Sequence, residues 1–292
     1  MTKKIKWLFF GSLLLLITEC KTSNEHKYPI KISLSDSIPL TIIAVEKEQE
    51  VKKEVINESV DVEEVKDENI IWIQEHVNKE FLLGNVVRKD NPLFVKIDTV
   101  YTERSIYLLA QVYEAFKNMY DAAIADSVKL IITSGHRLFG EQVYEWELRW
   151  NNPRTEIVFE NDTDKAIYIL KYRAMPGTTR HHWGTDIDLN SFELAYYETQ
   201  EGRKVYDWLK TNAKRFGFYQ PYTPKDSNRA TGYEEEKWHW SYKPLSQYML
   251  AKYLELVSID DIAGFEGDTA AKKLPILSGW VSGINQHLKE TD

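Results

Sequence analysis

Cysteine is almost absent from this sequence: its 292 residues include only one, Cys20. A single thiol excludes an intramolecular disulfide and any site with several cysteine ligands. A bound metal would therefore have to be held by His, Asp and Glu side chains. The His-Glu-x-x-His helix motif is also absent, so a zinc site would need another arrangement of ligands.

Positive charge is scarce as well. The formal net charge is −8, whereas a nucleic-acid-binding protein usually carries a basic surface, so a nucleic-acid partner is disfavoured. Residues 46–69 hold ten acidic and four basic side chains, a balance of −6. Most of the excess negative charge therefore lies in one short segment, and the rest of the chain is close to neutral.

The sequence has no hydrophobic run long enough to cross a bilayer. Its main apolar run, residues 7–17, falls short of the roughly 20 residues that a transmembrane helix needs. Three lysines precede this run, which is the layout of an export signal. Cys20 follows where a bacterial lipoprotein carries its lipidated cysteine, although Glu19 replaces the usual small residue. We expect a lipid-anchored protein of the cell envelope; the alternative is an ordinary secreted protein.

Changes in composition divide the chain into four parts. Residues 1–20 form the export signal, and residues 21–69 form a charged tether, either disordered or partly helical. Aromatic and aliphatic residues become frequent from Ile70, so we expect the catalytic domain to span residues 70–257. Residues 258–292 show too weak a pattern to be assigned. No internal repeat is present, and we expect a monomer.

Hydrophobic spacing in the central part predicts an α+β fold with a small, mainly antiparallel sheet and flanking helices. Helical spacing occurs at residues 104–126, 137–150, 204–217 and 246–257. Strand-like runs occur at residues 128–135, 184–190 and 237–242. Helices and strands alternate without a regular β-α-β rhythm, which disfavours a parallel sheet.

Two stretches contain the candidate metal ligands. "TTRHHWGTDIDLN", residues 178–190, holds His181, His182, Asp186 and Asp188, and "EKWHWSY" holds His239. Two histidines and one aspartate suit an open zinc site, in which three protein ligands leave a position for water. Adjacent residues of an extended chain point to opposite faces. Spacing alone does not choose between the two histidines or between the two aspartates.

With these stretches together, the sequence resembles the zinc D-alanyl-D-alanine carboxypeptidases of the vancomycin-resistance type and the related L,D-carboxypeptidases. Their first motif, S-x-H-x-x-G-x-A-x-D, aligns with "TRHHWGTDID" and implies that His181 and Asp188 bind zinc. Their second motif, E-x-W-H, aligns with "EKWH" and implies Glu236 as catalytic carboxylate and His239 as third ligand. The resemblance thus implies a mononuclear zinc cleft.

A third stretch, "SGHRLFGEQ", is similar to the family's S-G-Y-R segment. The resemblance implies that Ser134, Arg137 and Gln142 line the substrate cleft. Arg137 would stabilise the oxyanion of the reaction or pair with the substrate's terminal carboxylate. The similarity extends more loosely from Leu82 to Tyr253.

The sequence departs from the family motifs at informative places. Thr179 replaces a serine and keeps its hydroxyl, whereas Asp186 replaces an alanine and adds a charge. Asp186 is either a partner that orients a ligand or substrate, or a solvated neighbour. Strict alternation along a strand would place Glu235 on the face of His239. The family motif instead points to Glu236, which requires a turn or bulge before Trp238.

The resemblance implies a zinc metallopeptidase that removes the C-terminal D-Ala from peptidoglycan stem peptides. A zinc-activated water would attack the peptide bond, and Glu236 would serve as general base. The alternatives are an L,D-carboxypeptidase or dipeptidase acting on wall peptides, and a non-catalytic zinc-containing envelope protein that binds them. The expected partners are the stem peptide and, through lipidated Cys20, the membrane.

Overall fold

The computed structural model describes residues 73, 75–152 and 157–289. The expected export signal, Cys20 and the expected tether lie outside the described residues. The described residues all belong to one compact unit of the chain.

Six short strands form two antiparallel sheets. β1 pairs with β2, and the other four strands lie in the order β3-β4-β6-β5. The strands are β1 (Phe94–Lys96), β2 (Tyr107–Leu109), β3 (Ile132–Ser134), β4 (Asp186–Leu189), β5 (Phe218–Tyr219) and β6 (His239–Tyr242). The larger sheet is assembled from distant parts of the chain, with β4 and β6 at its centre.

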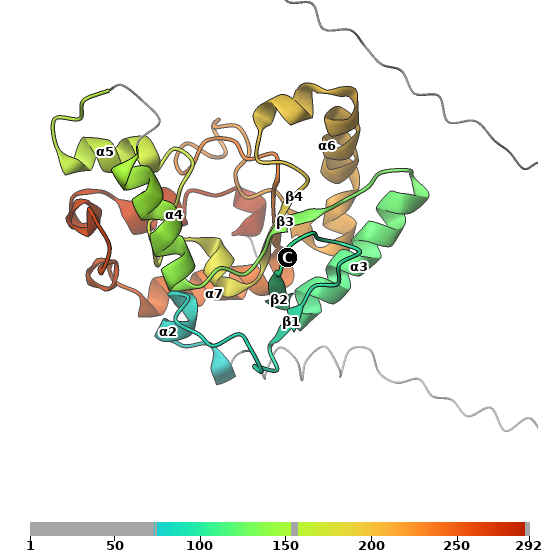
Figure 1. Ribbon diagram of the computed structural model, residues 1–292, viewed down its shortest axis with the longest axis horizontal. Helices are drawn as coiled ribbons and strands as arrows, with labels where there is room; N and C mark the ends of the chain where they lie inside the picture. Colours follow the sequence, from blue (N-terminus) through green and yellow to red (C-terminus); the bar gives the residue numbers. More distant parts are fainter. Residues whose placement is uncertain (1–72, 74, 153–156, 290–292) are drawn as a thin grey trace, which may run out of the picture. The chain divides into compact units, whose positions relative to one another are not determined.

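Helices surround this sheet, and the predicted α+β class is confirmed. In Figure 1, α3 and α6 lie to one side of the labelled strands and α4 and α5 to the other. The α-helices are α2 (Lys79–Leu82), α3 (Ala110–Ala125), α4 (Phe139–Asn151), α5 (Asp162–Ile169), α6 (Gln200–Asn212) and α7 (Lys243–Leu256). The shorter helical segments are η1 (Arg180–Trp183), η2 (Leu194–Glu198), η3 (Ala213–Phe216), η4 (Ile259–Asp261), η5 (Asp268–Lys273), η6 (Ile276–Val281) and η7 (Gln286–Leu288).

Several element boundaries differ from the sequence prediction, and for two of them the neighbouring residues give the reason. The helix expected from residue 104 begins only at Ala110, because residues 107–109 pair with β1 as strand β2. The strand expected from residue 237 begins only at His239, because residues 237 and 238 form a turn. Helical or strand-like spacing reports which side chains are buried, and it does not show where a neighbouring strand begins to pair.

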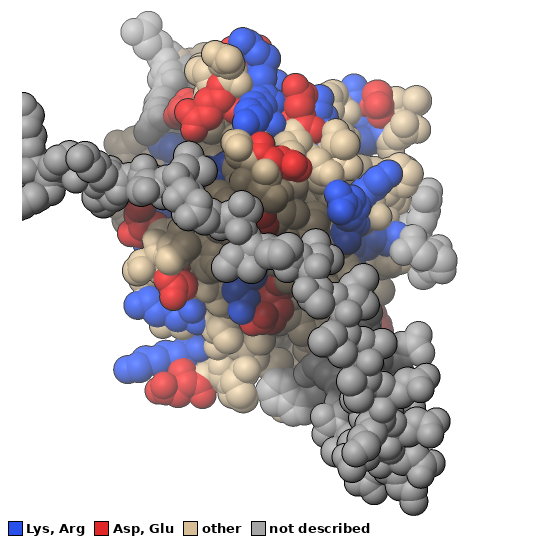
Figure 2. All heavy atoms as spheres, turned by 90° about the vertical axis from the view of Figure 1, so that its right-hand side faces the viewer, with Lys and Arg blue, Asp and Glu red and all other residues tan. Residues whose placement is uncertain are grey.

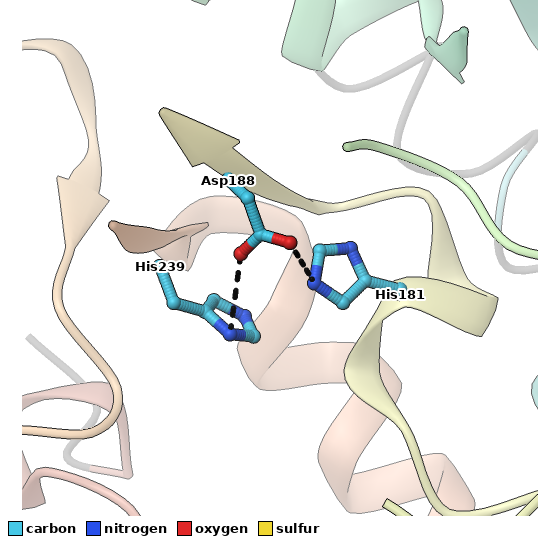
Figure 3. A group of neighbouring side chains, drawn as sticks. All are labelled: His181, Asp188 and His239. Carbon is cyan, nitrogen blue, oxygen red and sulfur yellow. Dashed lines mark ion pairs between the residues drawn. The ribbon is translucent and has the colours of Figure 1, made fainter. Parts of the chain in front are cut away.

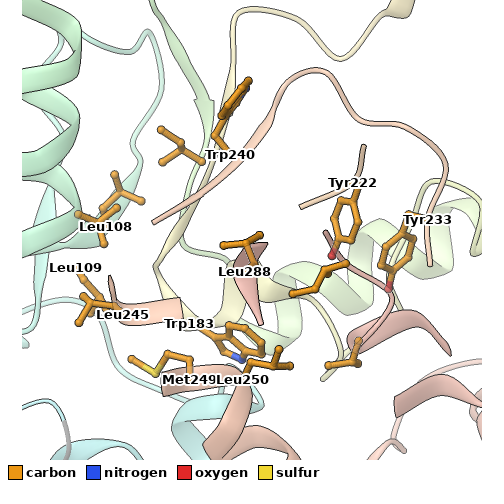
Figure 4. Packing of buried hydrophobic residues seen from close by; sticks show 14 of the residues in the cluster. Leu108, Leu109, Trp183, Tyr222, Tyr233, Trp240, Leu245, Met249, Leu250 and Leu288 are labelled. Carbon is orange, nitrogen blue, oxygen red and sulfur yellow. The ribbon is translucent and has the colours of Figure 1, made fainter. Parts of the chain in front are cut away.

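The core continues beyond residue 257 into the segment that the sequence left unassigned. Ile262, Ala271, Ile276 and Leu288 are all at most 1% exposed and belong to the main hydrophobic cluster. Leu288 lies among core side chains that include those of α7 (Figure 4). Residues 258–289 therefore pack with the main hydrophobic cluster. Their buried apolar residues follow no helical or strand period in the sequence.

The surface of this unit carries charges of both signs. In the view of Figure 2, acidic and basic side chains are interspersed over the described atoms, without a continuous basic patch on that face. Within the described ranges, no helix combines the length and apolar character that a membrane span requires.

Candidate metal centre

The central strands β4 and β6 set two of the predicted ligands side by side. Their antiparallel register pairs Asp188 with His239, and it pairs Asp186 with Ser241. Asp186 and Asp188 are two residues apart on β4, so both project from the same face of the sheet. Ile187 and Trp240, which also pair with each other, lie in the hydrophobic core. One face of the central strands is thus polar and the other apolar.

The third predicted ligand comes from the one-turn 3₁₀ helix η1, just before β4. The hydroxyl of Thr179 accepts a hydrogen bond from the backbone N–H of His181 and caps this helix. Gly184 ends it with φ +70°, and a Cβ there would lie 2.9 Å from the ring of Phe94. Glycine suits both the left-handed backbone and the close approach. The chain can therefore turn directly from η1 into β4 and place His181 beside Asp188.

His181, Asp188 and His239 converge on one point (Figure 3). One potential ligand atom from each lies within 4.8 Å of the others, and all three residues are buried. The Oδ2 atom of Asp188 lies 3.2 Å from Nε2 of His181, and its Oδ1 atom lies 3.7 Å from Nδ1 of His239. The structure thus brings together the three ligands that the motifs imply.

The two adjacent histidines have different surroundings. His181 Nδ1 lies 2.8 Å from the carbonyl oxygen of Gly135, so it donates there and leaves Nε2 free to face Asp188. His182 accepts a hydrogen bond from the N–H of Gly177 at Nε2 and donates from Nδ1 to the carbonyl of Arg137. Both nitrogens of His182 are occupied by the backbone. Only His181 can serve as a ligand in this arrangement.

Burial lowers the pKa of both histidines. Burial lowers the pKa of His182 to about 3, against the weaker opposing effect of its backbone partner. Burial likewise lowers the pKa of His181, although the neighbouring Asp188 opposes the shift. Both rings are therefore neutral at pH 7, which is the form in which imidazole binds a metal.

Glu236 reaches the centre because the chain turns before β6. The backbone N–H of His239 donates to the carbonyl of Glu236, and the Glu236 Oε2 atom lies 2.9 Å from His239 Nδ1. Glu235 instead accepts a hydrogen bond from the hydroxyl of Tyr206. The turn replaces the alternation expected of a strand. It also places Trp238 at the edge of the central cavity.

Asp186 lies behind His239 and is completely buried. Its Oδ2 atom is 2.9 Å from Nε2 of His239 and 2.9 Å from Nε of Arg180. Asp186 is therefore not a solvated neighbour of the site. Because the second nitrogen of His239 contacts Asp186, its Nδ1 atom is the one that faces Asp188.

Arg137 faces Asp188 from the opposite side of the cavity. Its Nη2 atom lies 3.8 Å from Asp188 Oδ2 and donates to the hydroxyl of Ser134, while Nη1 donates to the side-chain oxygen of Gln142. Ser134 and Gln142 were both expected to line the substrate cleft. Ser134 borders a neighbouring cavity, whereas Gln142 is fully buried and acts through Arg137. Together they hold the guanidinium group in place.

Acidic and basic side chains in the centre shift one another's pKa. Burial alone would raise the pKa of Asp188, but the imidazoles of His181 and His239 and the Arg137 guanidinium hold it at about 2. Burial opposes protonation of His239, yet the hydrogen bonds that its ring donates to Asp186 and Glu236 raise its pKa to about 10. The group of acids around His239 thus stabilises a cation at this position, whether a proton or a metal ion.

The residues present fit a divalent metal with nitrogen and oxygen ligands. Asp188 Oδ1 is buried without any hydrogen-bond partner, which a native protein rarely tolerates unless an ion or water completes the site. The outer nitrogens of His181 and His239 each contact an oxygen atom, an arrangement that orients metal-binding histidines. Two histidines and one carboxylate form an open zinc site.

The metal centre lies at the bottom of a small cavity of about 30 Å³. Its wall includes Tyr172, Arg173, Tyr222 and Tyr233, none of which the sequence analysis singled out. These residues are far from the motifs in sequence or separated from them by a loop, so no spacing signal could have found them. A larger cavity of about 640 Å³ shares Tyr172, Arg173 and Trp238 with the first. The two cavities are therefore neighbours, with these three residues bordering both.

His136, the other histidine of the motif regions, does not join this centre. It is 5% exposed, and its ring packs 4.3 Å from that of Phe94. Burial lowers its pKa well below the usual value. Its ring thus packs against the core, and the residue also lines the neighbouring cavity that Ser134 borders.

Comparison with known proteins agrees with this geometry. Residues 105–245 match the sequence model of the VanY family, described as D-alanyl-D-alanine carboxypeptidase. Over these residues the chain is a homologue of the VanY family. The D-alanyl-D-alanine carboxypeptidase of Enterococcus faecalis is 28% identical to it over 166 residues, which cover 54% of this chain. The present chain spans 57% of the length of that relative.

Two solved structures of VanY proteins are similar to this chain. VanYB in complex with D-alanine-D-alanine is 22% identical, with a TM-score of 0.44, over 71% of this chain and 97% of that one. The Zn(II) complex of a mutant of the vancomycin-resistance D,D-pentapeptidase VanY is 27% identical, with a TM-score of 0.38, over 56% of this chain and 88% of that one. A homologous structure thus contains zinc.

The region that matches VanY contains every residue of the candidate centre. It begins before Arg137 and ends after His239, and it includes both ligands of the first motif. The chain is therefore a VanY-family D,D-carboxypeptidase homologue with a candidate zinc site formed by His181, Asp188 and His239.

Proposed function

We propose that this protein is a zinc-dependent peptidase that removes the C-terminal D-Ala from peptidoglycan stem peptides. The proposal rests chiefly on one observation: His181, Asp188 and His239 converge at a cavity that Glu236 and Arg137 also border. Homology of residues 105–245 to the VanY family supports the same reaction class. We propose the substrate and the general base in addition, because homology alone gives neither.

Bound zinc would supply a water molecule that ionises near neutral pH. Glu236 is the group on this chain that can accept a proton, because its carboxylate borders the cavity and is only 7% exposed. It would then return the proton to the leaving amine. Arg137, with its guanidinium held by Ser134 and Gln142, would stabilise the developing oxyanion or bind the terminal carboxylate of the peptide.

The shape of the cleft supports a substrate longer than a dipeptide. The cavity at the metal centre has room for little more than a reacting group, whereas the adjoining cavity is about twenty times larger (~30 against ~640 Å³). Tyr172, Arg173 and Trp238 connect the two. The remainder of a stem peptide would occupy the larger cavity, which favours a carboxypeptidase over a dipeptidase.

We propose further that the protein works in the cell envelope, anchored by lipidated Cys20. The basic start, the short apolar run and the position of the single cysteine support this placement. A charged segment of nearly fifty residues would then give the peptidase reach toward the wall. Radiolabelled palmitate should enter the wild-type protein in a bacterial host and should not enter Cys20→Ser.

The experiment that tests the activity uses the full chain without a polyhistidine tag. Metal analysis should find one zinc per chain. Incubation with muropeptides carrying pentapeptide, tetrapeptide and dipeptide stems should shorten the pentapeptide by one D-Ala, as read by mass spectrometry. Shortening of the tetrapeptide alone would establish an L,D-carboxypeptidase instead. Stoichiometric zinc with no cleavage of any wall peptide would favour the non-catalytic binding protein.

A further inference from the structure

Asp186, which stands where the family motif has alanine, is the most heavily hydrogen-bonded carboxylate near the centre. Its Oδ2 atom accepts from Arg180 Nε and contacts His239 Nε2, both at 2.9 Å. Its Oδ1 atom accepts from the hydroxyls of Thr185 at 2.6 Å and Ser241 at 2.8 Å. Four partners satisfy a fully buried carboxylate, so the group is held in a single orientation.

The sheet register explains why this carboxylate meets His239. Asp188 lies opposite His239 in the ladder between β4 and β6, and Asp186 lies opposite Ser241 on the same face. The imidazole of His239 therefore lies among three carboxylates, with Nε2 toward Asp186 and with Nδ1 toward both Glu236 and Asp188. A carboxylate only accepts hydrogen bonds. Asp186 therefore holds the proton on Nε2, and Nδ1 is the nitrogen whose proton, donated to Glu236 here, a metal would replace.

Arg180 compensates the charge that Asp186 adds. It is 1% exposed, donates from Nε to Asp186 and from Nη2 to the hydroxyl of Ser241, and lies 4.7 Å from the centre of the Trp183 ring. The pair contributes no net charge to the centre. It also ties η1, which carries His181, to β4 and β6, which carry the other two ligands. A buried ion pair is a poor source of stability and a better means of fixing one geometry.

We infer that the Arg180–Asp186 pair is a positioning device that holds His239 in the tautomer and orientation in which Nδ1 binds the metal. The inference rests on the proposed zinc site. Groups that hydrogen-bond the outer nitrogen of a metal-binding histidine raise metal affinity, on the order of 10- to 100-fold. Asp186 serves His239 in this way, as the Gly135 carbonyl serves His181.

The tautomer can be tested directly on the wild-type protein. In the zinc-loaded full chain, ¹H–¹⁵N correlation spectra of the histidine rings should show His239 protonated at Nε2 and not at Nδ1. The single variant His239→Gln assigns the signal. A proton on Nδ1, or a zinc ion bound through Nε2, would overturn the inference even if the protein binds zinc and cleaves peptides.

The energetic contribution can be tested by double substitution, because removing Asp186 alone would leave Arg180 as an unpaired buried cation. Asp186→Ala combined with Arg180→Met removes both charges. We expect its zinc affinity, measured by competition with a chromophoric chelator, to fall on the order of 10- to 100-fold. Asp186→Asn retains an oxygen that can accept from His239 and should lose less.

The matched control is Asp261→Asn, which changes an aspartate whose partners are Lys79 and Ser258, outside the centre. It should leave zinc affinity unchanged. Wild-type zinc affinity in the double variant, with melting showing that it is folded, would overturn the inference. Failure of the wild type itself to bind zinc would instead refute the proposed function, so the two failures are distinguishable.

Discussion

Two short stretches build the candidate centre, and in both a turn decides which of two similar neighbours faces the metal. In residues 180–188, the single 3₁₀ turn of η1 separates the adjacent histidines, so that His181 faces Asp188 while His182 binds backbone groups. In residues 235–239, a turn before β6 brings Glu236 to the cavity and leaves Glu235 outside it. In the first stretch, the histidine that does not face the centre, His182, instead joins two backbone segments through hydrogen bonds.

The two stretches differ in the role of the residue that faces away from the centre, which is His182 in the first and Glu235 in the second. His182 is completely buried and joins residues 137 and 177 through its two nitrogens, so the fold depends on it. Glu235 is only partly buried, and its carboxylate contacts the hydroxyl of Tyr206. Substituting the unused neighbour should therefore be costly for stability in the first stretch and nearly harmless in the second.

The largest expected effect comes from the glutamate pair. Glu236→Gln should lower kcat on D-Ala-terminated stem peptides by about 10²- to 10⁴-fold, because general base catalysis contributes on that order. Zinc content should not change, since Glu236 is not among the three converging ligands. Steady-state kinetics and metal analysis measure both quantities.

Glu235→Gln is the matched control and should change kcat less than about twofold, because its carboxylate does not border the central cavity. If Glu235→Gln abolished cleavage while Glu236→Gln remained active, residues 235–239 would alternate as a regular strand in solution. The turn before β6 would then be absent.

The histidine pair should separate metal binding from stability. His181→Ala should lower zinc affinity by more than about 100-fold, since losing a ligand costs more than losing an outer partner. His182→Ala should retain zinc but lower the free energy of unfolding by roughly 3 kcal/mol, because it leaves a buried N–H and a buried carbonyl without partners and opens a cavity. Chelator competition and urea denaturation test these results. Zinc loss in both variants would mean that the two rings are not separated as described.

The pH dependence of stability should sharpen the contrast within the histidine pair. The pKa of His182 is about 3 in the folded protein and 6.5 in the unfolded chain. Below pH 6.5 only the unfolded chain gains this proton, so the contribution of His182 is complete above that pH and decreases as pH falls toward 3. The advantage of wild type over His182→Ala in unfolding free energy should therefore shrink below pH 6.5 by up to about 1.4 kcal/mol per pH unit, and it should reverse near pH 4 because it is only roughly 3 kcal/mol at pH 7. A constant difference would contradict a neutral, buried His182.

The smallest expected effect concerns the support of Arg137. Gln142→Ala removes one of the two hydrogen bonds that hold its guanidinium, and we expect kcat/KM to fall roughly tenfold, as with other small losses of positioning. Zinc affinity should stay unchanged. Ser134→Ala should also lower kcat/KM, but less than Gln142→Ala, because it removes only a hydroxyl that accepts one hydrogen bond from Arg137. A purely structural role for Gln142 would reduce stability without altering kcat/KM of the folded protein.

Much of the site could be predicted from the sequence because its chemistry is local. The near absence of cysteine restricted the ligands to imidazole and carboxylate, and the two motifs placed those ligands within ten and four residues. The apolar spacing located most of the helices and strands of residues 104–257. The identities of the three candidate ligands and the α+β class follow from this information.

Other features depended on contacts between distant segments. Thr179, His181 and Asp186 lie within eight residues, yet the role of Asp186 became clear only when β6 brought His239 and Ser241 beside it. A buried carboxylate needs a cation beside it. The presence of Arg180 in the same stretch was therefore the one sequence signal for its pairing with Asp186. The pairing itself could not be read from spacing.

By itself, the sequence determined which residue types could hold a metal and which two stretches supply them, because coordination chemistry depends on side-chain identity. The family motifs already implied which neighbour of each pair faces the centre, and the tertiary structure gave the physical reason. That structure alone decided how Asp186 and Arg180 are used and that residues 258–289 complete the core. These outcomes depend on the direction of a side chain after a turn and on burial against distant segments. Such properties arise only once the strands have paired and the helices have packed.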